Sequence, residues 1–128
     1  MPARDVTNYA IKQEFSTLQD LYLFRGSPTD NNKMPLLVHP GYGGTPPLSE
    51  FTPKPNNQAR AVITTGTKLT IIRIEEHSSP TIGSYTLVIG QITSGSEKGQ
   101  ACELNYISKR TTHSITVDHN TLENEQSP

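Results

Sequence analysis

The sequence predicts an all-β protein built as a small antiparallel barrel, and two observations support this prediction. The first is a series of segments rich in Ile, Val, Leu, Thr and Tyr, residues that pack well on a pleated sheet. These segments are Arg60–Thr65, Lys68–Ile74, Ser84–Ile92 and Ala101–Ile107. The second is the turn-forming residues Gly, Ser and Pro between these segments, which recur about every ten residues and are typical of a small barrel.

The composition limits what such a barrel can be. A chain of 128 residues buries roughly two-thirds of its unfolded surface as one domain. The net charge of −1 provides no bulk attraction to nucleic acid phosphates or to an anionic membrane, so nucleic acid is a disfavoured partner. No run approaches the ~20 apolar residues of a membrane-spanning helix. The oligomeric state is not predicted.

The chain begins with a polar segment, residues 1–19, ahead of the predicted domain. Its spaced apolar residues Ile11, Phe15 and Leu18 are compatible with a brief helix. Asp20–Phe24 follows as a clearer strand, with Leu and aromatic side chains alternating between its faces.

A long proline-rich loop follows this strand, from Gly26 to about Ala59. Because proline lacks a backbone donor and fixes its own φ, the segment is not expected to form a long helix or a central strand. Tyr42 and Phe51 are apolar anchors by which the loop folds back on the barrel. Seven of the ten prolines lie here: Pro28, Pro35, Pro40, Pro46, Pro47, Pro53 and Pro55.

The strands of the second half carry apolar residues on both faces, which requires a cover or a sharp bend. Gly90 is the expected position of such a bend, because glycine in a strand often marks a bulge. The proline-rich loop is the candidate cover. If the protein has a site, it is expected where this loop meets the strands.

The chain ends with one possible short strand, Ser114–Val117, and residues 118–128 are expected to be a disordered tail. The predicted domain therefore spans residues 20–117. A strand, a long loop, three hairpin-connected strands and a closing strand favour a five-stranded SH3-like barrel. An OB-fold is the alternative, but no helical pattern lies between the strands.

These strands and turns carry a resemblance to known proteins. The residues concerned are Leu21-Tyr22-Leu23-Phe24-Arg25, Thr65-Gly66-Thr67-Lys68-Leu69-Thr70-Ile71, Ser94-Gly95, Lys98-Gly99-Gln100 and Glu103-Leu104. Over residues 20–107 the chain resembles small uncharacterised bacterial proteins with SH3-like barrels, many of them exported or lipid-anchored. If Met1 stands where an export signal has been removed, the protein is predicted to be periplasmic or envelope-associated. Otherwise it is predicted to be cytoplasmic.

The aromatic, histidine and cysteine residues of the chain indicate binding more than catalysis. Tyr42, Phe51, His39 and His77 are the candidate binding residues. No metal-ligand spacing, cofactor motif or catalytic set is recognised. Cys102 lies in mid-strand and is expected to be a buried free thiol.

The predicted function is therefore a non-catalytic binding protein of the bacterial envelope with a protein partner, in an inhibitor, immunity or accessory role. One alternative is a small hydrolase or metal-dependent enzyme. An ordered pocket holding two or more of His39, His77, Glu75, Glu76 and Cys102 would favour that alternative. A second alternative is a barrel that binds single-stranded nucleic acid by aromatic stacking.

Overall fold

The computed structural model describes residues 6–24, 34–42, 45–52, 59–80, 83–111 and 114–124, and these form a β-rich structure as predicted. An eight-stranded sheet has the order β11-β2-β6-β7-β8-β4-β3-β5, and a three-stranded sheet has the order β1-β10-β9. The strands are β1 (Val6–Thr7), β2 (Glu14–Thr17), β3 (Leu21–Phe24), β4 (Leu36–Val38), β5 (Ala59–Ile63), β6 (Lys68–Ser79), β7 (Gly83–Ile92), β8 (Ala101–Glu103), β9 (Lys109–Thr111), β10 (Ser114–Thr116) and β11 (Leu122–Asn124). Two 3₁₀ turns, η2 (Leu48–Glu50) and η3 (Asn105–Ile107), complete the described elements.

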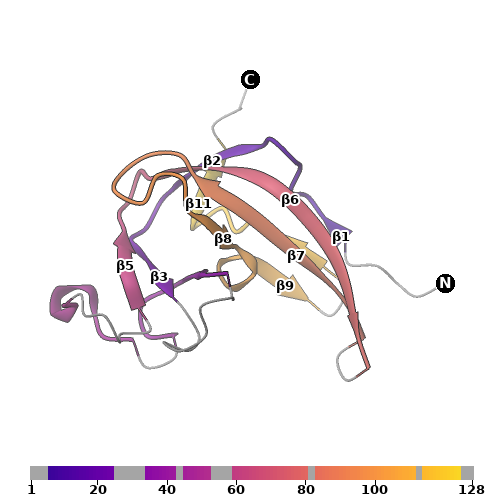
Figure 1. Ribbon diagram of the computed structural model, residues 1–128, viewed down its shortest axis with the longest axis horizontal. Helices are drawn as coiled ribbons and strands as arrows, with labels where there is room; N and C mark the ends of the chain where they lie inside the picture. The colour runs from indigo at the N-terminus through magenta and orange to yellow at the C-terminus, as the bar shows by residue number, and fades with distance from the viewer. Residues whose placement is uncertain are drawn as a thin grey trace.

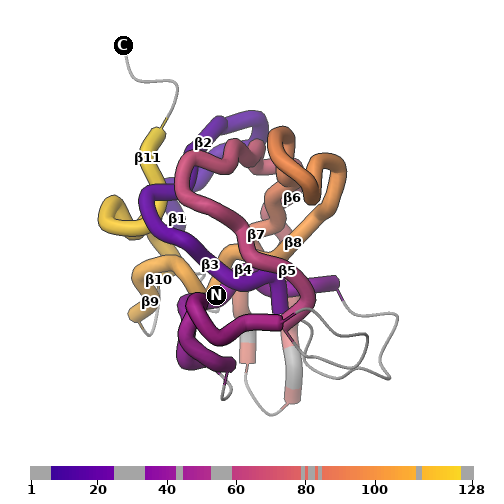
Figure 2. Tube along the Cα trace, turned by 90° about the vertical axis from the view of Figure 1, so that its left-hand side faces the viewer, coloured from indigo at the N-terminus to yellow at the C-terminus, as the bar shows by residue number. Residues whose placement is uncertain are grey.

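The large sheet is strongly curled in both views (Figures 1 and 2), and its strands contribute residues to one main core. It nevertheless differs from the expected five-stranded antiparallel barrel. It holds eight strands, its edge strands β11 and β5 are not neighbours, and β4 pairs with β8 in parallel. A second parallel pair joins β1 to β10. Three of these strands come from segments where no strand was predicted: β2 from the N-terminal polar segment, β4 from the proline-rich loop and β11 from the tail.

The ends of the predicted domain also differ from the structure. Phe15 is fully buried in β2, while Ile11 and Leu18 are 54% and 41% exposed, so the three do not form one helical face. β2 pairs with β6 on one side and with β11 on the other. Leu122 is fully buried in β11, within the stretch expected to be tail. The sheet therefore extends beyond residues 20–117, because single apolar residues in polar surroundings anchor both terminal strands.

The longest feature is the hairpin of β6 and β7, which arches across the molecule in Figure 1. Its register shifts between Ile71 and Arg73, directly across from Gly90. The bulge thus lies on β6, opposite the glycine where a bend was expected. A Cβ on Gly90 would lie 2.9 Å from the Cδ1 of buried Leu104, so a larger residue here would have to displace the end of that side chain.

The two faces of the sheet bury two separate apolar clusters. On β3, Leu21 and Leu23 belong to the main core, while Tyr22 and Phe24 belong to a second cluster on the opposite face. Leu48 and Phe51 from the proline-rich segment pack against this second cluster, and the Tyr22 hydroxyl donates to the Pro46 carbonyl at 2.9 Å. Residues 45–52 therefore cover the second face over β3, β4 and β5, whereas the cover was expected over the strands of the second half. Residues 26–33, 43–44 and 53–58 of the loop lie outside the described residues.

Among the described residues, none of the helical turns has the length or the apolar character needed to cross a membrane.

Candidate functional site

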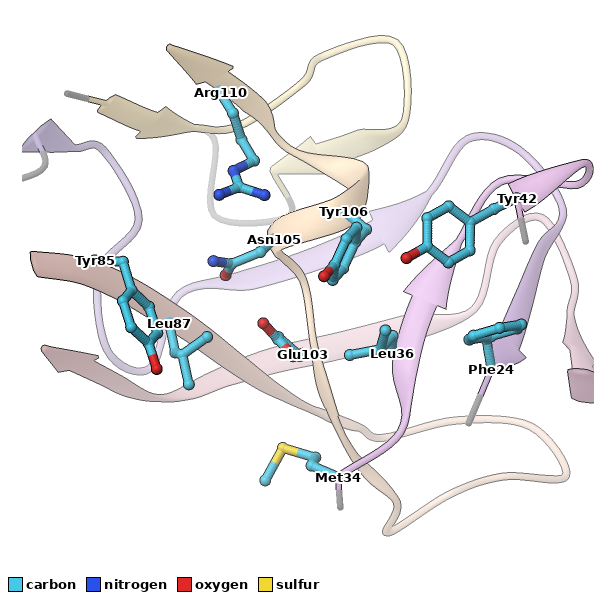
Figure 3. Close-up of a pocket in the computed structure, with 10 residues that line it drawn as sticks. All are labelled: Phe24, Met34, Leu36, Tyr42, Tyr85, Leu87, Glu103, Asn105, Tyr106 and Arg110. Atoms are coloured by element: carbon cyan, nitrogen blue, oxygen red, sulfur yellow. The ribbon is translucent and has the colours of Figure 1, made fainter. Parts of the chain in front are cut away.

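A cleft of about 690 Å³ opens on the second face of the sheet, where the proline-rich segment meets β7, β8 and η3 (Figure 3). Strand alternation explains part of its lining. Because Thr86 and Val88 are buried on β7, Tyr85 and Leu87 point to the opposite face, and Glu103 does the same beside buried Cys102. The lining residues are Phe24, Met34, Leu36, Tyr42, Tyr85, Leu87, Glu103, Asn105, Tyr106 and Arg110.

Three aromatic rings form one continuous wall of the cleft. The Tyr42 ring packs edge-on against Phe24 and tilted against Tyr106, with ring centroids 5.2 Å apart in each pair. Tyr42 comes from the turn after β4 and Tyr106 from η3, so two segments distant in sequence build the wall. Both rings keep an exposed surface, 38% for Tyr42 and 42% for Tyr106. Desolvation raises the pKa of Tyr106, and a hydrogen bond with Tyr42 raises it further.

Glu103 places a carboxylate at the centre of the cleft, between the aromatic wall and Tyr85 (Figure 3). Its backbone N–H donates to the Pro35 carbonyl at 2.9 Å, at the point where β8 pairs with β4. Desolvation raises the pKa of this half-buried carboxyl, and the charges of Arg110 and His77 oppose that rise. Within the described part of the chain, no residue donates a hydrogen bond to the Glu103 carboxylate or forms an ion pair with it.

Asn105 holds the residues of the cleft in place. Its side chain is 3% exposed and bridges to β7, accepting from the Val88 N–H at 2.9 Å and donating to the Thr86 carbonyl at 2.7 Å. The side-chain amide thus continues the β7–β8 pairing beyond the end of β8, as a peptide group would. Because Glu103 lies two residues before Asn105 and Tyr106 directly follows it, this bridge restrains the positions of both.

Charged and polar groups occupy the remaining rim. Arg110 extends from β9 towards Asn105 and Tyr106, while Met34 lies on the far side of Glu103 (Figure 3). The ring of His77 stacks on Tyr85 with centroids 5.5 Å apart and also contacts Glu75 at 2.9 Å. The aromatic surface of the cleft therefore continues onto the β6–β7 hairpin.

The four predicted binding residues have different positions relative to this cleft. Tyr42 lines the cleft, and His77 stacks on Tyr85, which also lines it. Phe51 instead packs on Tyr22 at 5.1 Å, and the backbone carbonyl of His39 accepts from the Tyr42 N–H at 3.2 Å within the turn after β4. Neither Phe51 nor His39 lines the cleft.

Glu103, Tyr106 and Arg110 were not among the binding residues predicted from the sequence. A signal existed for Glu103, because a carboxylate between Cys102 and Leu104 in a buried strand must face the other side of the sheet. No comparable signal existed for Tyr106, whose direction depends on the turn η3.

The groups with catalytic potential do not converge in the cleft. Cys102 is buried, as expected, and burial raises the pKa of its thiol to about 12. Across the described ranges, no group of three or more His, Cys, Asp or Glu residues has the geometry to hold a metal ion. What the cleft presents is an aromatic surface around one desolvated carboxylate, an arrangement suited to binding.

Comparison of the chain with protein-family models, with curated proteins and with solved structures gives no match.

Proposed function

We propose that this chain is a non-catalytic binding protein that engages a protein partner through the aromatic cleft. The observation that carries the proposal is the half-buried Glu103 carboxylate, which lies among aromatic rings without a donor from the described residues. A charge that is desolvated without hydrogen-bond partners costs stability, and such groups cluster at functional sites. Inhibitor, immunity and accessory roles in the bacterial envelope all fall within this class.

The size and surface of the cleft support this function. A cavity of about 690 Å³ lies within the range of pockets that receive small ligands or a few side chains. Tyrosine and arginine are enriched among residues that dominate binding energy, because their rigid or planar groups lose little entropy on contact. Tyr42, Tyr106 and Arg110 present such groups at the rim of one cleft.

The alternatives find less support in this arrangement. None of the five residues whose convergence would favour an enzyme lines the cleft, and Glu75 pairs with His77 on an exposed stretch of β6. For single-stranded nucleic acid, the tyrosines would provide stacking platforms. The Glu103 carboxylate would repel the phosphates, so a protein partner is favoured.

We also infer that β5 to β8 correspond to the core strands of an SH3-like barrel, with the remaining strands as elaborations. The strongly bent β6–β7 hairpin and its bulge opposite Gly90 support this relationship. An experimental structure in which these strands superpose on SH3-like barrels would support it, and superposition on OB-folds instead would contradict it.

Site-specific photo-crosslinking tests the function directly. Benzoylphenylalanine replaces Tyr106 in the cleft or, as the matched control, the exposed Leu18 in the turn between β2 and β3, which does not line the cleft. Each full-length chain is irradiated with extract of the source organism. We expect a discrete adduct at position 106 that excess wild-type chain competes away and excess Tyr42→Ala chain does not. Equal adducts at both positions, or none at 106, would contradict the proposed function.

A further inference from the structure

We propose that the group received by this cleft is the cationic side chain of a lysine or arginine on the protein partner, with Glu103 as its counter-charge. This inference rests on the proposed function and specifies the chemistry of the partner.

The first argument is the hydrogen-bonding state of Glu103. An ionised carboxylate accepts up to about four hydrogen bonds, and a desolvated one needs them most. The described residues provide none to this side chain, although Arg110 and His77 are near enough to affect its pKa. A ligand that brings N–H donors and a positive charge would satisfy the group, whereas an acidic or purely apolar ligand would leave it unsatisfied.

The second argument is the aromatic surface around the carboxylate. Phe24, Tyr42 and Tyr106 are packed at 5.2 Å centroid spacing, and Tyr85 lies across the cleft. The faces of aromatic rings carry negative potential and attract ammonium and guanidinium groups, the more strongly when water is excluded. Aromatic rings combined with a carboxylate therefore select a cation over a neutral group of the same size.

The third argument concerns the stem of the incoming side chain and the role of Arg110. Met34 lies on one side of Glu103 and Arg110 on the other, with Leu36 beside Glu103 (Figure 3). A lysine or arginine buries its methylene stem on apolar surface while its charged end makes polar contacts. With the stem over Met34 and Leu36, the cationic end meets Glu103 before it approaches Arg110. The charge of Arg110 meanwhile favours the ionised form of Glu103 that the cation needs.

Binding of small probes to the full chain tests this chemistry. The probes are the N-acetyl N-methylamides of lysine, arginine and norleucine, the last a neutral analogue of the lysine side chain, and amide chemical shifts follow the titrations. We expect the lysine or arginine probe to bind about tenfold more tightly than the norleucine probe, a ratio within the range of one desolvated cation–π and carboxylate contact.

Two variants locate the effect. Glu103→Gln keeps the size of the side chain and is expected to reduce the affinity for the cationic probe about tenfold, to that of the norleucine probe. Glu97→Gln removes a carboxylate in the loop between β7 and β8, outside the cleft lining, and is expected to change nothing. Circular dichroism confirms that both variants are folded.

Several results would overturn the inference: equal affinity for the norleucine and lysine probes, cation binding that survives Glu103→Gln, or tighter binding of an N-acetyl aspartate methylamide or of oligothymidine. Binding of free spermidine without an adduct at position 106 would overturn the protein source of the cation. If the adduct forms but the cationic probes show no preference, the proposed function stands and the cation inference fails.

Discussion

Replacing Asn105 by Ala should destabilise the fold by removing the bridge between η3 and β7. The variant loses the acceptor for the Val88 N–H and the donor to the Thr86 carbonyl, bonds of 2.9 and 2.7 Å made by a side chain that is 3% exposed. At about 1–2 kcal/mol for each buried bond, the free energy of unfolding should fall by about 2–4 kcal/mol. For a chain of this length that corresponds to a Tm decrease of roughly 8–16 °C.

Thermal unfolding monitored by circular dichroism measures this decrease, with urea unfolding as an independent measure of the free energy. Gln100→Ala is the matched control, because its side-chain amide also donates to a backbone carbonyl, that of Ala101 at 2.8 Å, but at an exposed position. We expect the control to change the free energy by less than about 0.5 kcal/mol. A Tm decrease below about 4 °C for Asn105→Ala would show that water replaces the bridge and would refute the assigned role of Asn105.

Three further predictions concern single buried or half-buried groups. Gly90→Ala should lower the free energy of unfolding by about 1–3 kcal/mol through overpacking, because its Cβ would lie 2.9 Å from the Cδ1 of buried Leu104. Unchanged urea unfolding would show that the Leu104 side chain moves aside and would contradict the prediction; Gln91→Ala is the control. The thiol of Cys102, whose pKa burial raises to about 12, should react with Ellman's reagent only in denaturant, and rapid reaction of the native chain would contradict its burial. Desolvation raises the pKa of Glu103 in the folded state, so the stability it contributes is present at low pH and is lost as the pH rises through the raised value. Glu103→Gln should therefore gain stability relative to wild type between acidic and neutral pH, and an opposite trend in urea unfolding would indicate an unrecognised partner of the carboxylate.

The β-rich class and the main hairpin were predictable because they depend on local residue types. The burial of Cys102 was predictable from its place in an apolar strand and is confirmed. The bulge expected at Gly90 lies opposite it on β6, and the proline-rich cover lies over β3, β4 and β5 rather than over the strands of the second half. Tyr42 was identified as an apolar anchor of the proline-rich loop, but the same reasoning also selected Phe51, which packs outside the cleft.

The strand count and the centre of the cleft depend on non-local pairing instead. β4 is a three-residue strand within the proline-rich segment, and its parallel pairing with β8 through Leu36 and Glu103 has no local signature. β11 depends on the single buried Leu122 in a polar stretch. The cleft forms only when β4, β7 and η3 are brought together, so the meeting of Tyr42 with Tyr106 could not be read from either segment alone.

Fluorine NMR of the full chain labelled with 3-fluorotyrosine tests most directly whether the cleft is the binding surface. The chain has five tyrosines; Tyr42, Tyr85 and Tyr106 line the cleft, while Tyr9 and Tyr22 are buried elsewhere. Single Tyr→Phe variants assign the resonances, and the lysine methylamide serves as the probe. We predict that the three cleft resonances shift on titration and the other two do not. Shifts confined to Tyr9 and Tyr22, or no shift at any tyrosine up to high probe concentration, would contradict binding in the cleft.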